Sequence, residues 1–262
     1  MARTLGMIGC QVLEDEMAHL VSRDPEIRNV LVIDSTKERT LATKIKRMAT
    51  DKKVTIRDEN YDIGKFRHGK DLSVIVWIKP INLHQSPKLL REEVFKVVWR
   101  LEPFVQSILL LYGQCGNAFL NLDPVDGDRR VPLTILKDEQ GMLMDDCFGT
   151  VLGGRDEYRS FLIGEDGPSY VLNSMWAANW RNFMIEVQML RDPNDIGEIK
   201  DLFKYMDYRR VVGLNTGLLE EEVFNMLLEE FSDTFAMPSE NKECTLRVLE
   251  RSYQEAKEHL LA

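Results

Sequence analysis

The stretch Thr4-Leu-Gly-Met-Ile-Gly-Cys decides the fold, because a buried strand over Leu5–Gly9 leads directly into an amphipathic helix. The apolar residues of that helix fall on one face: Val12, Leu13, Met17 and Leu20. A strand followed at once by a helix is the repeating unit of an α/β fold. We therefore expect the rest of the chain to repeat this unit.

The alternation of strand and helix continues along the chain. Short runs rich in Val, Ile and Leu predict six further strands: Asn29–Asp34, Leu72–Ile78, Ser107–Tyr112, Val131–Leu136, Ser169–Leu172 and Arg210–Leu214. Residues 145–162 are expected to form a helix that is kinked at Gly153 and Gly154. Continuous apolar strands are typical of parallel sheets covered on both faces. We predict an α/β protein with mostly parallel sheets and helices on both faces. It forms one domain over residues 1–262, or two closely packed Rossmann-like lobes over about 1–106 and 107–262.

Composition restricts the class of protein. A chain of 262 residues with 44% hydrophobic and 29% charged residues can bury the core of a soluble globular protein. The formal net charge of −9 argues against a nucleic-acid partner. The apolar runs are too short to span a membrane, and the N-terminal residues, which lack a continuous apolar segment, are not expected to be a secretory signal. We expect a cytoplasmic protein whose four cysteines are free, catalytic or metal-bound.

Common catalytic motifs are absent from the sequence. It contains no Gly-x-Gly-x-x-Gly, no phosphate-binding loop, no Gly-x-Ser-x-Gly, no His-Glu-x-x-His and no Cys-x-x-Cys. The four histidines lie in polar surroundings and are predicted to be surface residues: His19, His68, His84 and His259. The sequence therefore does not favour a Ser/His/Asp hydrolase.

Three cysteines follow apolar runs at the points where predicted strands end. Cys10 ends the first strand, Cys115 follows Ser107–Tyr112, and Cys147 follows Val131–Leu136. The carboxyl ends of parallel strands share one edge of a sheet, so these thiols are expected to converge there. Three thiolates suit Zn²⁺ with an open fourth position, or an iron–sulfur cluster with one iron free for another ligand. The alternative is that each cysteine is a small buried hydrophobic side chain.

Five blocks of sequence occur in order along most of the chain. They are Met7-Ile-Gly-Cys-Gln-Val-Leu-Glu-Asp-Glu, Leu111-Tyr-Gly-Gln-Cys-Gly-Asn, Asp145-Asp-Cys-Phe-Gly-Thr-Val-Leu-Gly-Gly, Tyr170-Val-Leu-Asn-Ser-Met-Trp and Leu214-Asn-Thr-Gly. Together they resemble an uncharacterised domain-of-unknown-function family that is found beside corrinoid-dependent methyltransferase genes in methanogenic archaea and some bacteria. The resemblance implies a setting in one-carbon metabolism rather than a particular reaction.

The resemblance also implies which residues form the site. Its cysteine positions correspond to Cys10, Cys115 and Cys147, and an acidic position corresponds to Glu16. This chain departs from the family pattern twice. Asp146 stands where many members have His, and Gln11 stands where Gly is common. A histidine ligand immediately before Cys147 is therefore not expected here.

The leading hypothesis is a metal centre held by Cys10, Cys115 and Cys147 that acts in or beside corrinoid-linked methyl transfer. The metal is Zn²⁺ or an iron–sulfur cluster, and a corrinoid would come from a partner protein. Glu16 and Asp146 are predicted to be catalytic or proton-handling groups. Five residues are predicted to line the ligand crevice: Tyr112, Gly116, Asn117, Trp176 and Thr216.

Two alternatives remain open at this point. The chain could be a non-enzymatic adaptor or assembly partner of a corrinoid protein or methyltransferase, because its surface is acidic and its last helix, over residues 243–262, is strongly charged. It could instead bind a small metabolite in a crevice where the cysteines are only packing residues. The sequence leaves the metal, the methyl donor and the oligomeric state open.

Overall fold

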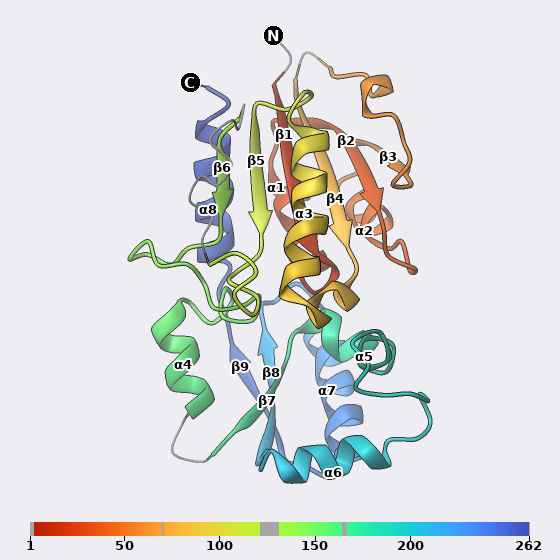
Figure 1. Ribbon diagram of the computed structural model, residues 1–262, viewed down its shortest axis with the longest axis vertical. Coiled ribbons are helices and arrows are strands. Elements are labelled where there is room, and N and C mark those ends of the chain that lie inside the picture. Colours follow the sequence, from red (N-terminus) through yellow and green to blue (C-terminus); the bar gives the residue numbers. More distant parts are fainter. Residues whose placement is uncertain (1–2, 70, 121–130, 164–166, 262) are drawn as a thin grey trace.

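The computed structural model describes residues 3–69, 71–120, 131–163 and 167–261, which form two parallel β-sheets flanked by helices (Figure 1). The larger sheet has the order β3-β2-β4-β1-β5-β6. Its strands are β1 (Thr4–Cys10), β2 (Ile27–Asp34), β3 (Lys53–Arg57), β4 (Leu72–Lys79), β5 (Ser107–Leu111) and β6 (Leu133–Ile135). Every pair of neighbouring strands in it is parallel. The predicted α/β class is confirmed.

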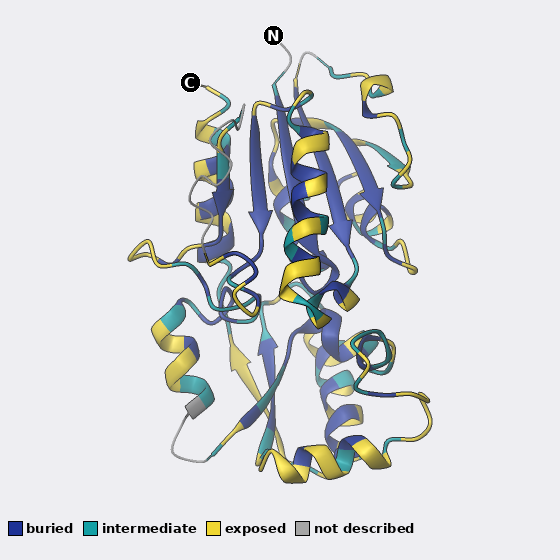
Figure 2. Ribbon diagram, in the orientation of Figure 1, coloured by how far each residue is buried: buried dark blue, intermediate teal, exposed yellow. Residues whose placement is uncertain are grey.

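The central strands of this sheet are buried on both faces. Every residue of β1, β4 and β5 is buried, and Figure 2 shows this continuous interior. Helix α3 (Pro87–Leu101) covers one face, while α1 (Glu14–Arg23) and α2 (Leu41–Met48) cover the other (Figure 1). Apolar side chains that alternate between two covered faces explain why these strands appear in the sequence as continuous hydrophobic runs.

The smaller sheet contains β7 (Ser169–Leu172), β8 (Arg210–Asn215) and β9 (Ser239–Glu243), which are parallel and in that order. Its helices are α4 (Arg155–Ile163), α5 (Ser174–Glu186), α6 (Gly197–Tyr205) and α7 (Glu221–Phe235). Aromatic rings fill the space beside it. Tyr170 of β7 stacks on Phe231 of α7, with the ring centroids 5.4 Å apart.

The last helix, α8 (Arg247–Glu258), returns to the larger sheet and contacts β5 and β6 (Figure 1). Asp24, which follows α1, anchors it. The Asp24 carboxylate accepts hydrogen bonds from the Tyr253 hydroxyl and the Lys257 Nζ, both at 2.6 Å. In the sequence, the smaller sheet thus lies between β6 and α8, while in the structure β6 and α8 pack against each other.

The structure confirms the predicted strands and corrects other expectations. It adds β3 and β9, and all five residues of β9 are exposed, so no apolar pattern marked that strand. The prediction of a helix over residues 145–162 is wrong for its first half, because α4 begins only at Arg155. There the Asp146 carboxylate accepts the Gly149 amide, and Gly153 has a φ of +103°, so turns replace helix until Arg155. Within the described ranges, every helix is too short or too polar to cross a membrane.

Candidate metal centre

The carboxyl ends of β4, β1 and β5 meet at the edge of the larger sheet that faces the smaller one (Figure 1). Cys10 is the last residue of β1, and Cys115 lies just beyond β5. A short 3₁₀ helix, η3 (Ile81–Gln85), follows β4. Gln11 begins a second 3₁₀ helix, η1 (Gln11–Leu13), and its side-chain oxygen accepts the Ile81 amide at 2.8 Å. Gln11 thus joins the ends of β1 and β4.

Three potential metal ligands converge at this edge. The donor atoms of His84, Cys115 and Cys147 all lie within 4.8 Å of one another. Both cysteines are buried and free, and His84 is half-buried. Two sulfurs and one imidazole nitrogen from three separate segments form a candidate metal centre.

Backbone hydrogen bonds hold the two cysteine segments together. The Gln114 amide donates to the Met144 carbonyl at 2.6 Å, and the Cys115 amide donates to the Asp145 carbonyl at 3.1 Å. Cys115 itself has a φ of +46°, an uncommon conformation for a non-glycine residue. Such a conformation persists only where the surrounding structure imposes it, so the position of the Cys115 thiol is fixed by its surroundings.

His84 is oriented by its own backbone neighbourhood. Its Nδ1 lies 3.2 Å from the Ile81 carbonyl, which can only accept, so Nδ1 carries the proton and Nε2 is left as the available ligand atom. Metal-binding histidines commonly donate their other ring nitrogen in this way. The sequence predicted a surface residue here, whereas His84 is half-buried and lies beside Cys115 and Cys147. His84, which follows β4, is the candidate ligand that the sequence did not single out.

The ionisation of the three groups is coupled. A hydrogen bond from the Cys147 thiol lowers the pKa of Cys115 to about 6 against the effect of burial, and His84 lowers it further. The same hydrogen bond, together with burial, raises the pKa of Cys147 well above its ordinary value. For His84, burial lowers the pKa, but the contact with Cys115 outweighs it and the net shift is upward. Cys10 has a pKa raised to about 12 by burial.

Tyr112 adds an unsatisfied hydroxyl beside these thiols. Its side chain is fully buried, and its hydroxyl has no hydrogen-bond partner among the described residues. Burial raises the pKa of Tyr112, and the charges of all three neighbouring cysteines raise it further. A buried donor without an acceptor is costly. Metal-bound thiolates would supply acceptors next to it, which fits a metal at this place.

A cavity of about 270 Å³ opens beside the three ligands. Of the residues predicted for the site, Cys10, Cys115, Gly116, Asp146, Cys147 and Trp176 line it. The Asp146 carboxylate also accepts hydrogen bonds from the Tyr158 hydroxyl and the Gly149 amide, which fix the turn around Cys147. Asn117 is exposed on the loop after Cys115, and Thr216 lies in the loop after β8; neither is among the residues that line the cavity.

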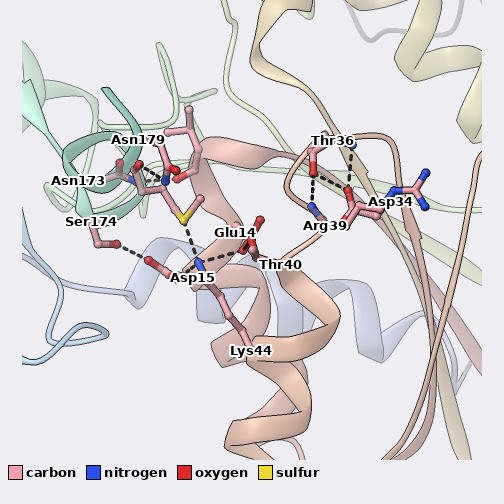
Figure 3. A network of polar contacts seen from close by, with 12 residues as sticks. Glu14, Asp15, Asp34, Thr36, Arg39, Thr40, Lys44, Asn173, Ser174 and Asn179 are labelled. Atoms are coloured by element: carbon pink, nitrogen blue, oxygen red, sulfur yellow. Dashed lines mark hydrogen bonds and ion pairs between the residues drawn. The ribbon is translucent and has the colours of Figure 1, made fainter. Parts of the chain in front are cut away.

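A polar network holds the cavity wall in place (Figure 3). At the start of α5, the Asn173 side-chain amide donates to the Val12 carbonyl at 2.6 Å, and the Ser174 hydroxyl donates to Asp15 at 2.5 Å. Lys44 of α2 binds the same Asp15 carboxylate at 2.6 Å. These contacts fix α5, and with it Trp176, against the end of β1.

Glu16 lies apart from this cavity. It is 1% exposed on α1, is not among the cavity-lining residues, and neither carboxylate oxygen has a hydrogen-bond partner from another described residue. Burial raises the pKa of Glu16 to about 8, and the charge of Asp15 adds to that effect. The predicted catalytic roles of Glu16 and Asp146 remain predictions.

Replacing Glu16 with glutamine is expected to remove a pH dependence of folding. The folded-state pKa of about 8 exceeds the ordinary value of 4.5. Below pH 4.5 the carboxyl is neutral in both the folded and the unfolded chain, and the stability of the fold is at its full value. As pH rises from 4.5 towards 8, the carboxyl ionises in the unfolded chain but not in the folded one, and stability is lost. A neutral amide avoids this loss, which is at most about 5 kcal/mol. Urea unfolding at pH 5 and pH 8 should show Glu16→Gln to be more stable than the native chain mainly at pH 8. The exposed Glu222→Gln is the control, and equal native and Glu16→Gln stabilities at pH 8 would refute this account of Glu16.

Comparison with known proteins gives one finding. A family model described as "Protein of unknown function (DUF1638)" matches residues 78–253, which is more than half of the chain and includes His84, Cys115 and Cys147. No curated protein and no solved structure gives a significant match.

Proposed function

Because the chain belongs to the DUF1638 family, whose description assigns no activity, we propose a function from the site: His84, Cys115 and Cys147 bind one Zn²⁺ ion. The convergence of these three donors within 4.8 Å carries the proposal. Thiolate and imidazole are preferred zinc ligands, and two cysteines with one histidine make up the protein ligands of a known type of catalytic zinc site.

The spacing of the donors favours a single ion over a cluster. Zinc–ligand bonds of about 2.0–2.3 Å in a tetrahedron place neighbouring ligands somewhat under 4 Å apart. The three donor atoms, which lie within 4.8 Å of one another, would reach this spacing after a small movement of their side chains. Cysteines that bind different irons of an iron–sulfur cluster are held further apart by the irons between them, and such clusters normally use four cysteines. Zinc is therefore the better fit.

Three protein ligands leave a tetrahedral ion one open position, on the side of the cavity. Zinc at such a position lowers the pKa of a bound thiol and makes it a nucleophile near neutral pH. Cys10 lines the same cavity, but its sulfur is not part of the group within 4.8 Å. The proposed centre needs only the other three ligands.

We place this chemistry in corrinoid-linked methyl transfer. The support is the resemblance of five sequence blocks to a family found beside corrinoid-dependent methyltransferase genes, together with a donor set suited to activating a thiol. In the transfer, the substrate sulfur forms a bond to the methyl carbon and the thiol loses its proton. The cobalt–carbon bond of the donor breaks, and its electron pair stays on cobalt.

Metal titration of anaerobically purified protein tests the zinc proposal. We expect one equivalent of Zn²⁺ to bind, and Co²⁺ to replace it with sulfur-to-cobalt charge-transfer absorption and a tetrahedral visible spectrum. Folded protein that binds neither ion in competition with a weak chelator would overturn the proposal. An intense absorption near 400 nm with stoichiometric iron and sulfide would overturn it in favour of a cluster.

Methylcobalamin with 2-mercaptoethanol tests the transfer separately. Zinc-loaded protein should release S-methyl-2-mercaptoethanol and reduced cobalamin, whereas metal-free protein should not. Zinc-loaded protein that shows no rate above the free thiol would refute methyl transfer and leave a zinc-binding protein.

A further inference from the structure

The walls of the cavity are mostly apolar away from the proposed metal ligands. Five aliphatic or aromatic side chains line it: Val12, Ile81, Phe148, Trp176 and Val187. Phe148 and Trp176 meet edge to face, with their ring centroids 6.2 Å apart. A ligand that reaches the open position therefore lies against hydrocarbon and aromatic surface.

Apart from the proposed ligand His84, the charged groups around the cavity are negative. Asp146 lines it, and no lysine or arginine is among the described residues of its lining. Glu186, next to the lining residue Val187, has a side chain only 7% exposed, and its Oε2 has no hydrogen-bond partner among the described residues. The Lys37 Nζ lies 3.5 Å from the other Glu186 oxygen, and 80% of the Lys37 side chain is exposed. Lys37 is not among the residues that line the cavity.

The Cys115 and Cys147 thiolates would balance the charge of the proposed divalent ion, so a further buried anion beside it would lack a partner. Moving an unpaired carboxylate or sulfonate out of water costs much more than burying a neutral group, and the carboxylates nearby would add repulsion. An ammonium group would avoid the repulsion, but Asp146 already accepts from Tyr158 and Gly149, and Glu186 is not among the lining residues. The apolar walls offer an ammonium no hydrogen bonds. The walls thus favour a ligand without charge.

Size sets a second limit. A volume of about 270 Å³ holds roughly nine water molecules at about 30 Å³ each, so it accommodates a ligand of fewer than about ten non-hydrogen atoms. We propose that the ligand of the open metal position is a small, uncharged alkyl thiol whose carbon chain lies against Phe148, Trp176 and Val187. This inference rests on the proposed metal centre and names the substrate class of that centre.

Three thiols of nearly equal size test the inference on the Co²⁺-substituted protein: 2-mercaptoethanol, cysteamine and mercaptoacetate. Binding of each is measured from the change in the cobalt spectrum. We expect 2-mercaptoethanol to bind at least about tenfold more tightly than mercaptoacetate and more tightly than cysteamine. If the cobalt spectrum shows an intact centre and either charged thiol binds as tightly as 2-mercaptoethanol or more tightly, the inference is overturned. Absence of the cobalt spectrum would instead be a failure of the metal proposal.

A charge placed in the wall provides a second test. Val187 is half-buried at the end of α5, so a longer side chain there can reach the mouth of the cavity. Val187→Lys should improve mercaptoacetate binding and reduce its disadvantage against 2-mercaptoethanol, whereas the uncharged control Val187→Met should not. Unchanged selectivity in Val187→Lys with a native cobalt spectrum would show that wall charge does not select the thiol, and would overturn the inference.

Discussion

Cys115→Ser and Cys147→Ser are each expected to lower zinc affinity by at least about a thousandfold, because a serine hydroxyl does not supply the thiolate that zinc binds. Both sulfurs belong to the group of donors within 4.8 Å. Competition with a chromogenic chelator measures the affinity, and circular dichroism checks that each variant is folded. His84→Gln should also lower zinc affinity.

Two further cysteine variants make this prediction specific. Cys244, which follows β9 and does not line the cavity, is the matched control, and Cys244→Ser should bind zinc as the native chain does. Cys10→Ser should keep most of the affinity, since the Cys10 sulfur lies outside the group of three donors. Native affinity in Cys115→Ser would contradict the centre, and a large loss in Cys10→Ser would instead support the three-cysteine hypothesis drawn from the sequence.

Gly113→Ala is expected to destabilise the fold by about 2–4 kcal/mol and to weaken zinc binding at the same time. A Cβ at residue 113 would lie 2.6 Å from the Met144 carbonyl oxygen and 2.9 Å from the Asp146 amide nitrogen. Both are backbone atoms, so they cannot rotate away as the end of a side chain can. The segment that carries Cys147 would have to move.

Thermal unfolding and zinc competition measure the two effects of Gly113→Ala. Gly197→Ala is the matched control, because among the described residues a Cβ at that exposed first residue of α6 meets only the Asp195 side chain, at 3.3 Å. That control should be neutral or slightly stabilising. Native stability and native zinc affinity in Gly113→Ala would show that the two cysteine segments are not held in the close contact described above.

Much of the fold follows from local sequence pattern. Buried strands such as β1 and β4 were predictable because hydrophobic runs of that length suit a covered parallel sheet. β9 was not, since its Ser-Glu-Asn-Lys-Glu sequence is exposed and is held in the sheet by backbone pairing with β8. The false helix at residue 145 arose because a side-chain-capped turn and a helix start share the same polar residues.

The candidate site was predictable only in part. Cys115 and Cys147 could be placed at the sheet edge because each follows a predicted strand. His84 follows a predicted strand as well, and that position was the available clue to it. What the sequence could not give was the order of strands, which sets β4 beside β1 and so brings the segment after β4 to the cysteines. Such adjacency depends on contacts between distant segments rather than on local pattern.

The return of α8 to β5 and β6 has a consequence for how the chain acquires its structure. The smaller sheet precedes α8 along the chain. The flank of the larger sheet that α8 covers therefore stays exposed until the residues of the smaller sheet have been synthesised. Contacts between such distant segments close large loops, and that slows folding. During synthesis, the apolar surface of β5 and β6 is thus exposed for longest, and a chain interrupted before Arg247 would present it to chaperones or to other unfinished chains.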